Sequence, residues 1–353
     1  MEQLAEGVQY AHAGGTKVFI TLNSFFHDED FDDFVGFLKK IEEIGVDAAI
    51  VSDIGVISTI RENSNIEIHL STQASCLNQY AARAYRDMGV KRLVLGREVS
   101  IAEASRIKKE SGIEVELFIH GSMCMAYSGQ CVISNYTAGR DSNRGGCAHS
   151  CRFEYQLDFE NGQKQTSTFM SSKDLNGLSL LGDYSKYEID SIKIEGRMKS
   201  VHYVSTVTKS YRRALDDLKQ NATISPETFN FCQNELNKLS HRDYTEASLI
   251  TPAGNDSIYD ERNYQAEEVG VIGEIVEVEQ DEYILLKVRS PIVAKDSIEI
   301  ITFQTDNVIL ENMDVVDVLG NQLDRANPGR IIRLPFYPGI ASRNVARKMG
   351  VTP

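Results

Sequence analysis

The sequence has few cysteines and no long apolar run. Six cysteines among 353 residues are too few for a disulfide scaffold. No apolar stretch approaches the ~18 residues of a membrane-spanning helix, so we expect no membrane partner. The acidic N-terminal segment, residues 1–15, lacks the basic start and the apolar centre of a signal peptide. We therefore expect a cytoplasmic protein.

Basic residues are also in deficit. The chain has 37 Lys and Arg against 51 Asp and Glu, which gives a formal net charge of −14. This balance argues against non-specific coating of nucleic acid by a basic surface. Residues 140–213 nevertheless carry 12 Lys and Arg against 9 Asp and Glu. A local basic region of this kind favours a selective anionic partner.

Several common catalytic motifs are missing. The HExxH, GxSxG, P-loop and GxGxxG patterns are all absent from the sequence. Zincin hydrolases, serine hydrolases, P-loop NTPases and Rossmann dehydrogenases depend on these patterns. These four classes therefore lack their residues in this chain.

Proline is absent from the first 225 residues, where β-branched runs alternate with helical patterns. This alternation predicts a parallel α/β fold, either a (β/α) barrel or an open doubly wound sheet. Ser100 and Glu103 have the spacing of a capping box at a helix start. The predicted strands are 17–22, 48–53, 67–71, 92–96, 114–120 and 191–196, and the predicted helices are 29–44, 54–62, 76–89, 100–111 and 200–219.

The hydrophobic period changes near residue 266. Residues 253–266 are polar and rich in turn formers, and we interpret them as a linker. Beyond them, runs such as 269–280 and 281–290 alternate with a period of two, which predicts a small all-β, barrel-like module. We therefore expect a barrel-like domain at 1–252 and a β domain at 267–353.

Four of the six cysteines lie close together in the sequence, in a Gly- and Ser-rich insert at 121–152. Four thiolates from one loop-rich segment can bind a metal centre. The paired CxxC knuckles of structural zinc are absent, and the irregular spacing favours an iron–sulfur cluster over zinc. The alternative is four unrelated buried thiols. Cys76 and Cys232 lie in helical patterns and are expected to be small buried hydrophobes.

Polar residues follow four of the predicted strands, where such folds place their chemistry. Lys193, Glu195 and Arg197 alternate with apolar residues and share one face of a strand and its exit. Their cations can hold a carboxylate or a phosphate, or the three can form an internal salt-bridge ladder. His120 is either catalytic or a hydrogen-bonded structural histidine. The candidate catalytic residues are His120, Glu98, Lys193, Glu195 and Arg197, and the candidate substrate-binding residues are Ser71, Gln73, Arg97, Lys173 and Arg197.

Long stretches of the chain resemble a known family. The segments ELFIHGSMCMAYSGQCVIS (116–134), NRGGCAHSCRFEY (143–155) and KIEGRMKSVHYV (193–204) resemble motifs of the U32 peptidase (collagenase-like) family. The shorter segments HLSTQAS and GREVS also match. The resemblance covers nearly the whole chain, including the β module at 265–340.

Within that family, HSCR and MSSKDL look most like the tRNA 5-hydroxyuridine modification proteins. The resemblance implies prephenate-dependent, oxygen-independent hydroxylation of the wobble uridine, with tRNA bound through its anticodon region and a small carboxylate as co-substrate. It also implies a possible partner subunit of the same family. The implied [4Fe-4S] ligands are Cys124, Cys131, Cys147 and Cys151.

The resemblance also implies a fold that is shortened at its N-terminus. Family members begin with two further βα units, and this chain starts inside a helical pattern that ends at Gly14. We therefore expect an α/β, TIM-like barrel without its first two βα units, followed by the small β domain. Two other functions remain open, a collagenase-like peptidase and a non-catalytic fragment that carries a cluster. No nucleophile–base set for a peptidase is evident, and the best pair is Cys124 with His120.

Overall fold

The computed structural model describes residues 1–254, 269–303 and 305–349. By its contacts the chain divides into two compact units, and both are discontinuous in sequence. Unit 1 comprises residues 1–195 and 242–263, and unit 2 comprises residues 196–241 and 264–353. Most of the expected linker, 253–266, lies outside the described residues.

Unit 1 is built on parallel strands, which confirms the α/β class. Strands β1 to β5 pair in sequence order, and β9 pairs in parallel with β5. All six strands predicted from the sequence are present. Their bounds are Phe19–Leu22 (β1), Ala48–Val51 (β2), Glu67–Leu70 (β3), Arg92–Val94 (β4), Glu114–Ser122 (β5) and Ser191–Ile194 (β9).

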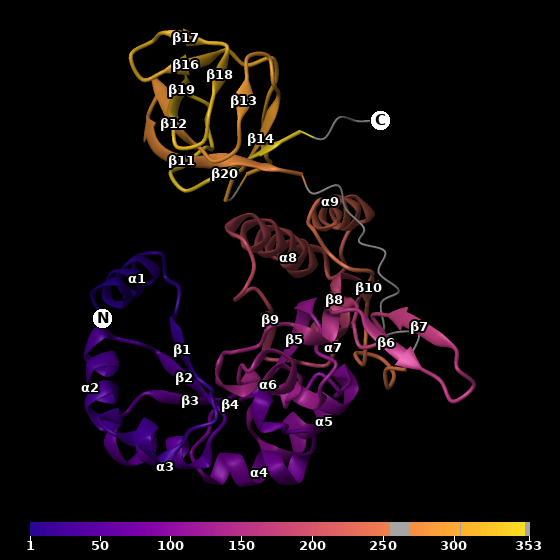
Figure 1. Ribbon diagram of the computed structural model, residues 1–353. Helices are drawn as coiled ribbons and strands as arrows, with labels where there is room; N and C mark the ends of the chain where they lie inside the picture. Colours follow the sequence, from indigo (N-terminus) through magenta and orange to yellow (C-terminus); the bar gives the residue numbers. More distant parts are fainter. Residues whose placement is uncertain (255–268, 304, 350–353) are drawn as a thin grey trace. The chain divides into compact units, whose positions relative to one another are not determined.

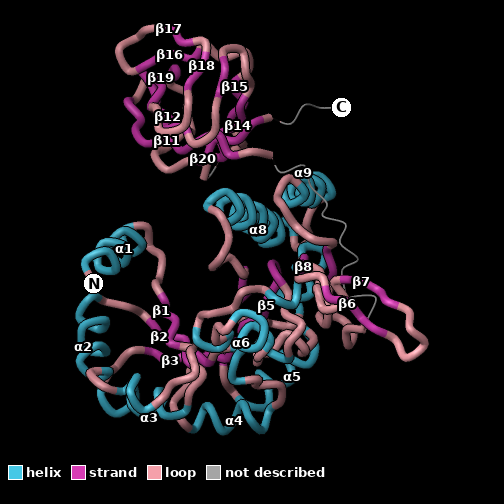
Figure 2. The backbone as a smooth tube through the Cα atoms, viewed as in Figure 1, coloured by secondary structure: helices cyan, strands magenta, loops and turns pink. Residues whose placement is uncertain are grey.

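Helices cover the outer side of this curved set of strands (Figure 2). The predicted capping box is confirmed, because Ser100 Oγ accepts from the Glu103 N–H while Glu103 accepts from the Ser100 N–H. The apolar side chains of α5, such as Ile101 and Ile107, are buried. The helices of unit 1 are Glu2–Ala13 (α1), Phe34–Ile44 (α2), Ile54–Asn63 (α3), Gln79–Asp87 (α4), Ile101–Ser111 (α5), Ile133–Ala138 (α6) and Leu181–Lys186 (α7).

Strand β5 organises the unit because it pairs with three strands. It pairs with β4 at residues 114–116 and with β9 at 116–120. At His120–Ser122 it also pairs with β8, an antiparallel strand at Asp174–Asn176. The short β10, Tyr244–Thr245, continues the sheet in parallel with β8. A separate hairpin is formed by β6, Tyr155–Asp158, and β7, Lys164–Ser167.

The two outer parallel strands are unpaired on one side. Among the described residues, β1 pairs only with β2, and β9 pairs only with β5. The parallel sheet is therefore established, whereas closure into a TIM-like barrel stays a prediction.

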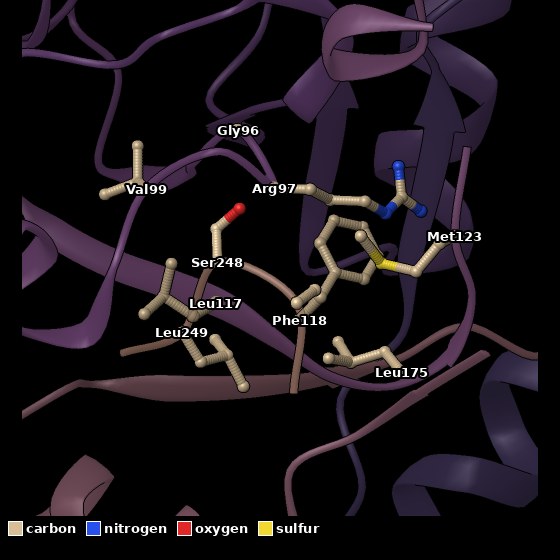
Figure 3. Close-up of a pocket in the computed structure, with 10 residues that line it drawn as sticks. Gly96, Arg97, Val99, Leu117, Phe118, Met123, Leu175, Ser248 and Leu249 are labelled. Carbon is tan, nitrogen blue, oxygen red and sulfur yellow. The ribbon is translucent and has the colours of Figure 1, made fainter. Parts of the chain in front are cut away.

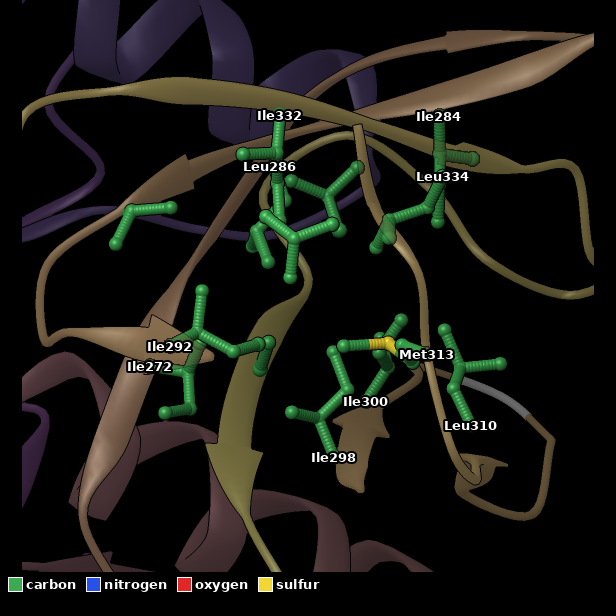
Figure 4. Packing of buried hydrophobic residues seen from close by; sticks show 14 of the residues in the cluster. Ile272, Ile284, Leu286, Ile292, Ile298, Ile300, Leu310, Met313, Ile332 and Leu334 are labelled. Carbon is green, nitrogen blue, oxygen red and sulfur yellow. The ribbon is translucent and has the colours of Figure 1, made fainter. Parts of the chain in front are cut away.

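Unit 2 combines two helices with antiparallel strands, as expected for the C-terminal β domain. Eight strands form a curled sheet in the order β15-β14-β20-β11-β12-β19-β16-β17, and β13 pairs with β18 (Figure 1). Isoleucine and leucine side chains fill the interior between them (Figure 4). The strands are Val271–Glu279 (β11), Tyr283–Val288 (β12), Ile292–Val293 (β13), Ile298–Ile301 (β14), Val308–Leu310 (β15), Val315–Asp317 (β16), Gln322–Leu323 (β17), Arg325–Ala326 (β18), Ile331–Pro335 (β19) and Val345–Lys348 (β20).

Helices α8, Val201–Asn221, and α9, Pro226–Asn237, belong to unit 2 by their contacts, although the sequence pattern places them within residues 1–252. A buried ion network is the physical reason. Arg347 of β20 is fully buried, and its Nη2 lies 2.6 Å from Glu235 Oε2 on α9 and 2.8 Å from Glu299 Oε2 on β14. His202 of α8 completes the network, with Nε2 3.5 Å from Arg347 Nη1.

A search of the described residues finds no helix with the length and apolar character needed to traverse a membrane.

Candidate functional site

The exits of β4 and β9 meet through a pair of charged side chains. Arg97 Nη2 lies 3.3 Å from Glu195 Oε2, and Arg97 is largely buried whereas Glu195 is half-buried. The Arg97 guanidinium also lies 4.0 Å above the centre of the Phe118 ring, which belongs to β5. This combination of ion pair and stacking holds a planar cation at the strand ends.

Apolar side chains line one side of the Arg97 guanidinium. Arg97 extends over Phe118, with Met123 beside it, at one end of a cavity of about 10 Å³ (Figure 3). Leu117, Leu175 and Leu249 line the rest of the cavity (Figure 3). This volume holds about one water molecule, so the pocket positions Arg97 but does not enclose a substrate.

Glu98 joins the cysteine-rich segment to the end of β4. Its Oε1 accepts from the Ser128 N–H at 2.7 Å, and its Oε2 accepts from Ser128 Oγ at 2.5 Å. A Cβ on Gly96 would stand 2.3 Å from Leu77 Cδ2 and 2.5 Å from Ser128 Oγ. A side chain at 96 would require Leu77 and Ser128 to move. Both carboxylate oxygens of the candidate acid Glu98 are engaged by Ser128.

The three residues that the sequence places on one strand face have different partners in the structure. Lys193 Nζ lies 2.9 Å from Glu116 Oε1 on β5, which is the internal salt bridge that the sequence left open as an alternative. Glu195 faces Arg97, as described above. Arg197 lies beyond β9, is exposed, and falls in unit 2.

The end of β3 supplies two candidate substrate-binding residues. Ser71 is buried, and its Oγ accepts from the Gln73 N–H at 3.3 Å and from Asn23 Nδ2 at 3.2 Å. The Gln73 carbonyl accepts from Gln130 Nε2 at 3.2 Å. Gln73 Oε1 is buried and has no hydrogen-bond partner within the part of the chain that the structure describes. Lys173, the remaining candidate, is half-buried directly before β8.

His120 is buried on β5, with its ring centre 5.5 Å from that of Tyr244. Its carbonyl accepts from the Glu195 N–H at 2.8 Å. The next residue, Gly121, has φ +121°, and a Cβ there would stand 2.6 Å from Glu195 Cβ. The backbone at 120–121 therefore fixes the position of Glu195 relative to β5, directly after the end of β9.

The four clustered cysteines lie on loops and short helices that are anchored to unit 1. Asn143 holds Cys131 from both sides, because its Oδ1 accepts from the Cys131 N–H at 3.3 Å and its Nδ2 donates to the Cys131 carbonyl at 2.8 Å. The Ile133 N–H donates to Cys131 Sγ at 3.4 Å. Ser172 Oγ donates to the Met123 carbonyl at 2.7 Å, directly before Cys124.

All four thiols are free, and they influence one another electrostatically. Burial raises the pKa of Cys124, and the neighbouring Cys131 and Cys147 add to this rise. Burial likewise raises the pKa of Cys151, with contributions from the other three thiols. A cysteine nucleophile requires the opposite, a lowered pKa. Cys76 and Cys232 are fully buried elsewhere, as expected.

The spacing of the thiols bears on which metal centre they suit. A tetrahedral zinc site, with Zn–S bonds of ~2.3 Å, draws its sulfurs to about 3.8 Å from each other. In residues 1–254, 269–303 and 305–349, no three His, Cys, Asp or Glu side chains are gathered closely enough to hold a metal ion. A multi-iron cluster lies between its ligands, so the ligand sulfurs can be farther apart than in a zinc site. Four thiols on one segment have the chemistry of an iron–sulfur ligand set.

Two ion pairs that anchor this region were not predicted from the sequence. Arg144 binds Asp30 in a bidentate pair at 2.5 and 2.9 Å, and Asp30 consequently has a lowered pKa. Arg242 Nη2 lies 2.5 Å from Asp174 Oδ1, with both side chains buried. The partners are 114 and 68 residues apart in sequence, so no local spacing could have indicated either pair.

The chain is similar in sequence to several known proteins. The family model described as "Peptidase family U32" matches residues 1–258. The tRNA hydroxylation protein P1 of Bacillus subtilis is 35% identical over 99% of this chain and 85% of its own length. The tRNA hydroxylation protein P of Helicobacter pylori strain 26695 is 38% identical over 71% of this chain and 62% of its own length.

A relative that acts on another RNA is also similar. The 23S rRNA 5-hydroxycytidine C2501 synthase of Escherichia coli is 31% identical over 85% of this chain and 46% of its own length. The match of the family model to most of the chain, together with these identities, establishes the family that the sequence motifs indicated. This chain belongs to the U32 peptidase family.

Proposed function

We propose that this protein hydroxylates RNA at C5 of a pyrimidine, with the wobble uridine of tRNA as its substrate. The observation that carries the proposal is the four-cysteine segment beside the Arg97–Glu195 pair at the ends of the parallel strands. Relatives that share this region are named for tRNA hydroxylation and for the synthesis of a hydroxycytidine in rRNA. The positively charged balance of residues 140–213 suits an anionic substrate.

We further propose an iron–sulfur cofactor. Cys124, Cys131, Cys147 and Cys151 would hold a [4Fe-4S] cluster, which supplies one-electron redox chemistry when bound. The protein's own contribution is positional. Asn143 holds the backbone of Cys131, and Ser172 holds the carbonyl that precedes Cys124, so the backbone at two of the four donors is held in place by the protein itself.

The co-substrate in this proposal is prephenate, a small molecule with two carboxylates. Arg97 is suited to bind one of them, because stacking on Phe118 orients its planar guanidinium. Glu195 supplies the carboxylate that faces Arg97 in the present structure, and a substrate carboxylate can take its place. Arg197, which the sequence also nominates, is exposed beyond the strand end and is a second candidate.

The decisive experiment is nucleoside mass spectrometry of RNA from a bacterial strain that lacks its own tRNA hydroxylation proteins. Expression of this chain should restore 5-hydroxyuridine-derived nucleosides in tRNA. Restoration of 5-hydroxycytidine in 23S rRNA alone would reassign the substrate to rRNA. Failure to restore either, by a chain that is expressed and folded, would contradict the proposed function.

A further inference from the structure

The cysteine-rich insert presents aromatic side chains that the fold does not use. Among the described residues, Tyr136 on α6 is the most exposed large apolar side chain, at 87%. Tyr127, before Cys131, is 60% exposed, and Phe153, after Cys151, is 48% exposed. Packing inside the protein does not explain three aromatic side chains that are about half exposed or more.

These rings are held on a firmly anchored segment. Thr137 Oγ1, next to Tyr136, donates to Ser150 Oγ at 2.7 Å, which ties α6 to the short helix before Phe153. Ser128, next to Tyr127, is bound through its N–H and Oγ to Glu98. The rings therefore project from a segment that is held in place, and less backbone freedom remains to be lost on binding.

The charge of the insert differs from that of the chain. Residues 121–152 contain three arginines and one aspartate, a balance of +2 in a protein whose net charge is −14. Arg144 is engaged by Asp30, whereas Arg140 is exposed just beyond the end of α6, after the left-handed C-cap Gly139. The N–H of Arg140 donates to the Ser134 carbonyl at 3.1 Å, so the backbone of Arg140 is held at the end of the helix that carries Tyr136.

The pattern favours nucleic acid over a protein partner. A helix that docks into a protein groove shows apolar residues at i, i+3, i+4 and i+7. Helix α6 has six residues and is too short to carry this repeat, and besides Tyr136 its exposed large apolar side chain is Val132 at the N-cap. Isolated aromatic rings beside arginine are typical of surfaces on which unpaired bases stack.

We propose that Tyr136, Tyr127, Phe153 and Arg140 form the surface on which an RNA loop docks, with unpaired bases stacked on the rings and phosphate held by Arg140. This inference rests on the proposed function and names the part of the chain that receives the RNA. Its position matters, because Cys131 lies two residues before the start of α6 and Cys151 lies two residues before Phe153. A loop bound here lies beside the four-cysteine site.

The test is fluorescence anisotropy of a labelled anticodon stem-loop RNA, titrated with the full-length chain. Tyr136→Ala should weaken binding about tenfold, and Tyr136→Phe, which keeps a ring, should bind nearly as the wild type does. Arg140→Gln should reduce the slope of log affinity against log salt by about 0.7, the value for one phosphate contact to a single strand. Tyr80→Ala is the matched control, because Tyr80 is 71% exposed on α4.

The outcomes separate this inference from the proposed function. Three results would each overturn the docking surface. The first is equal binding by the wild type and Tyr136→Ala, and the second is an equal loss of affinity in Tyr136→Ala and Tyr80→Ala. The third is no binding of the RNA by the wild type. Nucleoside mass spectrometry of complemented strains decides the proposed function independently. A wild-type chain that restores the modified nucleoside, with Tyr136→Ala equally active and equally tight, would leave the function standing without this surface.

Discussion

Arg97 and Glu195 form an ion pair between the exits of β4 and β9, although 98 residues separate them in sequence. The Arg97 guanidinium is also stacked on Phe118, so its plane is fixed. Arg97→Lys keeps the positive charge and loses both the planar fork and the stacking. We expect hydroxylation to fall about tenfold or more, equivalent to ~1.4 kcal/mol, as measured by nucleoside mass spectrometry of complemented strains.

The matched substitution is Arg197→Lys, because the sequence alone nominates Arg197 for the same carboxylate. If Arg197 grips the co-substrate bidentately, its replacement should cause a comparable tenfold fall. Normal activity in Arg197→Lys together with a loss in Arg97→Lys would assign the carboxylate to Arg97. The reverse pattern would limit the Arg97–Glu195 pair to a structural role.

The four clustered cysteines should confer colour on anaerobically purified protein. We expect broad visible absorbance in the wild type and its loss in Cys131→Ser or Cys147→Ser, with a lower melting temperature because metal binding is coupled to local folding. Cys232→Ala is the control, since Cys232 is buried between helices and its pKa is raised to about 11 by burial. Stoichiometric zinc without iron in the wild type would contradict the cluster.

The features that sequence reasoning predicted correctly are those with a local signature. Strand–helix alternation located six parallel strands, the Ser100–Glu103 spacing located a capping box, and the period-two runs located the β domain. Each of these depends on residues within one element or its immediate neighbours. The cysteine segment was equally visible because its four thiols lie close together in sequence.

The features that were missed depend on contacts between distant residues. Strand β8 has only three residues, too few to show a period, and it forms because β5 extends beyond β4. The partners of Lys193 and Arg97 were invisible for the same reason, since Glu116 and Glu195 come from other strands. Helices α8 and α9 group with the β strands through Arg347, which looks in sequence like an ordinary strand-end cation.

Arg347 should be essential to the stability of unit 2. Its side chain is fully buried between Glu235 and Glu299, and removal leaves two buried carboxylates without their cation. Arg347→Met should lower the free energy of unfolding by about 3–5 kcal/mol, measured by urea denaturation. Lys348→Met is the control, because Lys348 is half-exposed and 3.9 Å from Asp296. Lys348→Met should change the free energy of unfolding by no more than about 0.5 kcal/mol. Equal losses in Arg347→Met and Lys348→Met would exclude a special role for Arg347.

The same network should make unit 2 sensitive to mild acid. Burial, reinforced by the charge of Arg347, lowers the pKa of His202 from 6.5 to about 4. In the unfolded chain His202 binds a proton near pH 6.5, whereas in the folded protein it stays neutral until about pH 4. Its contribution to stability is therefore fully present above pH 6.5 and is lost as the pH falls toward 4.

Between pH 7 and pH 5 this loss amounts to about 2 kcal/mol. It can be measured as the change in the free energy of opening of unit 2 amides by hydrogen exchange, corrected for the intrinsic rates. His202→Asn has no imidazole to protonate. Between pH 7 and pH 5, the free energy of opening of its unit 2 amides should therefore change by about 2 kcal/mol less than that of the wild type. Glu299 also has a lowered pKa, but its protonation belongs to the range below about pH 4.5 and is common to both proteins. Parallel pH profiles for wild type and His202→Asn would show that His202 is not buried against Arg347 in solution.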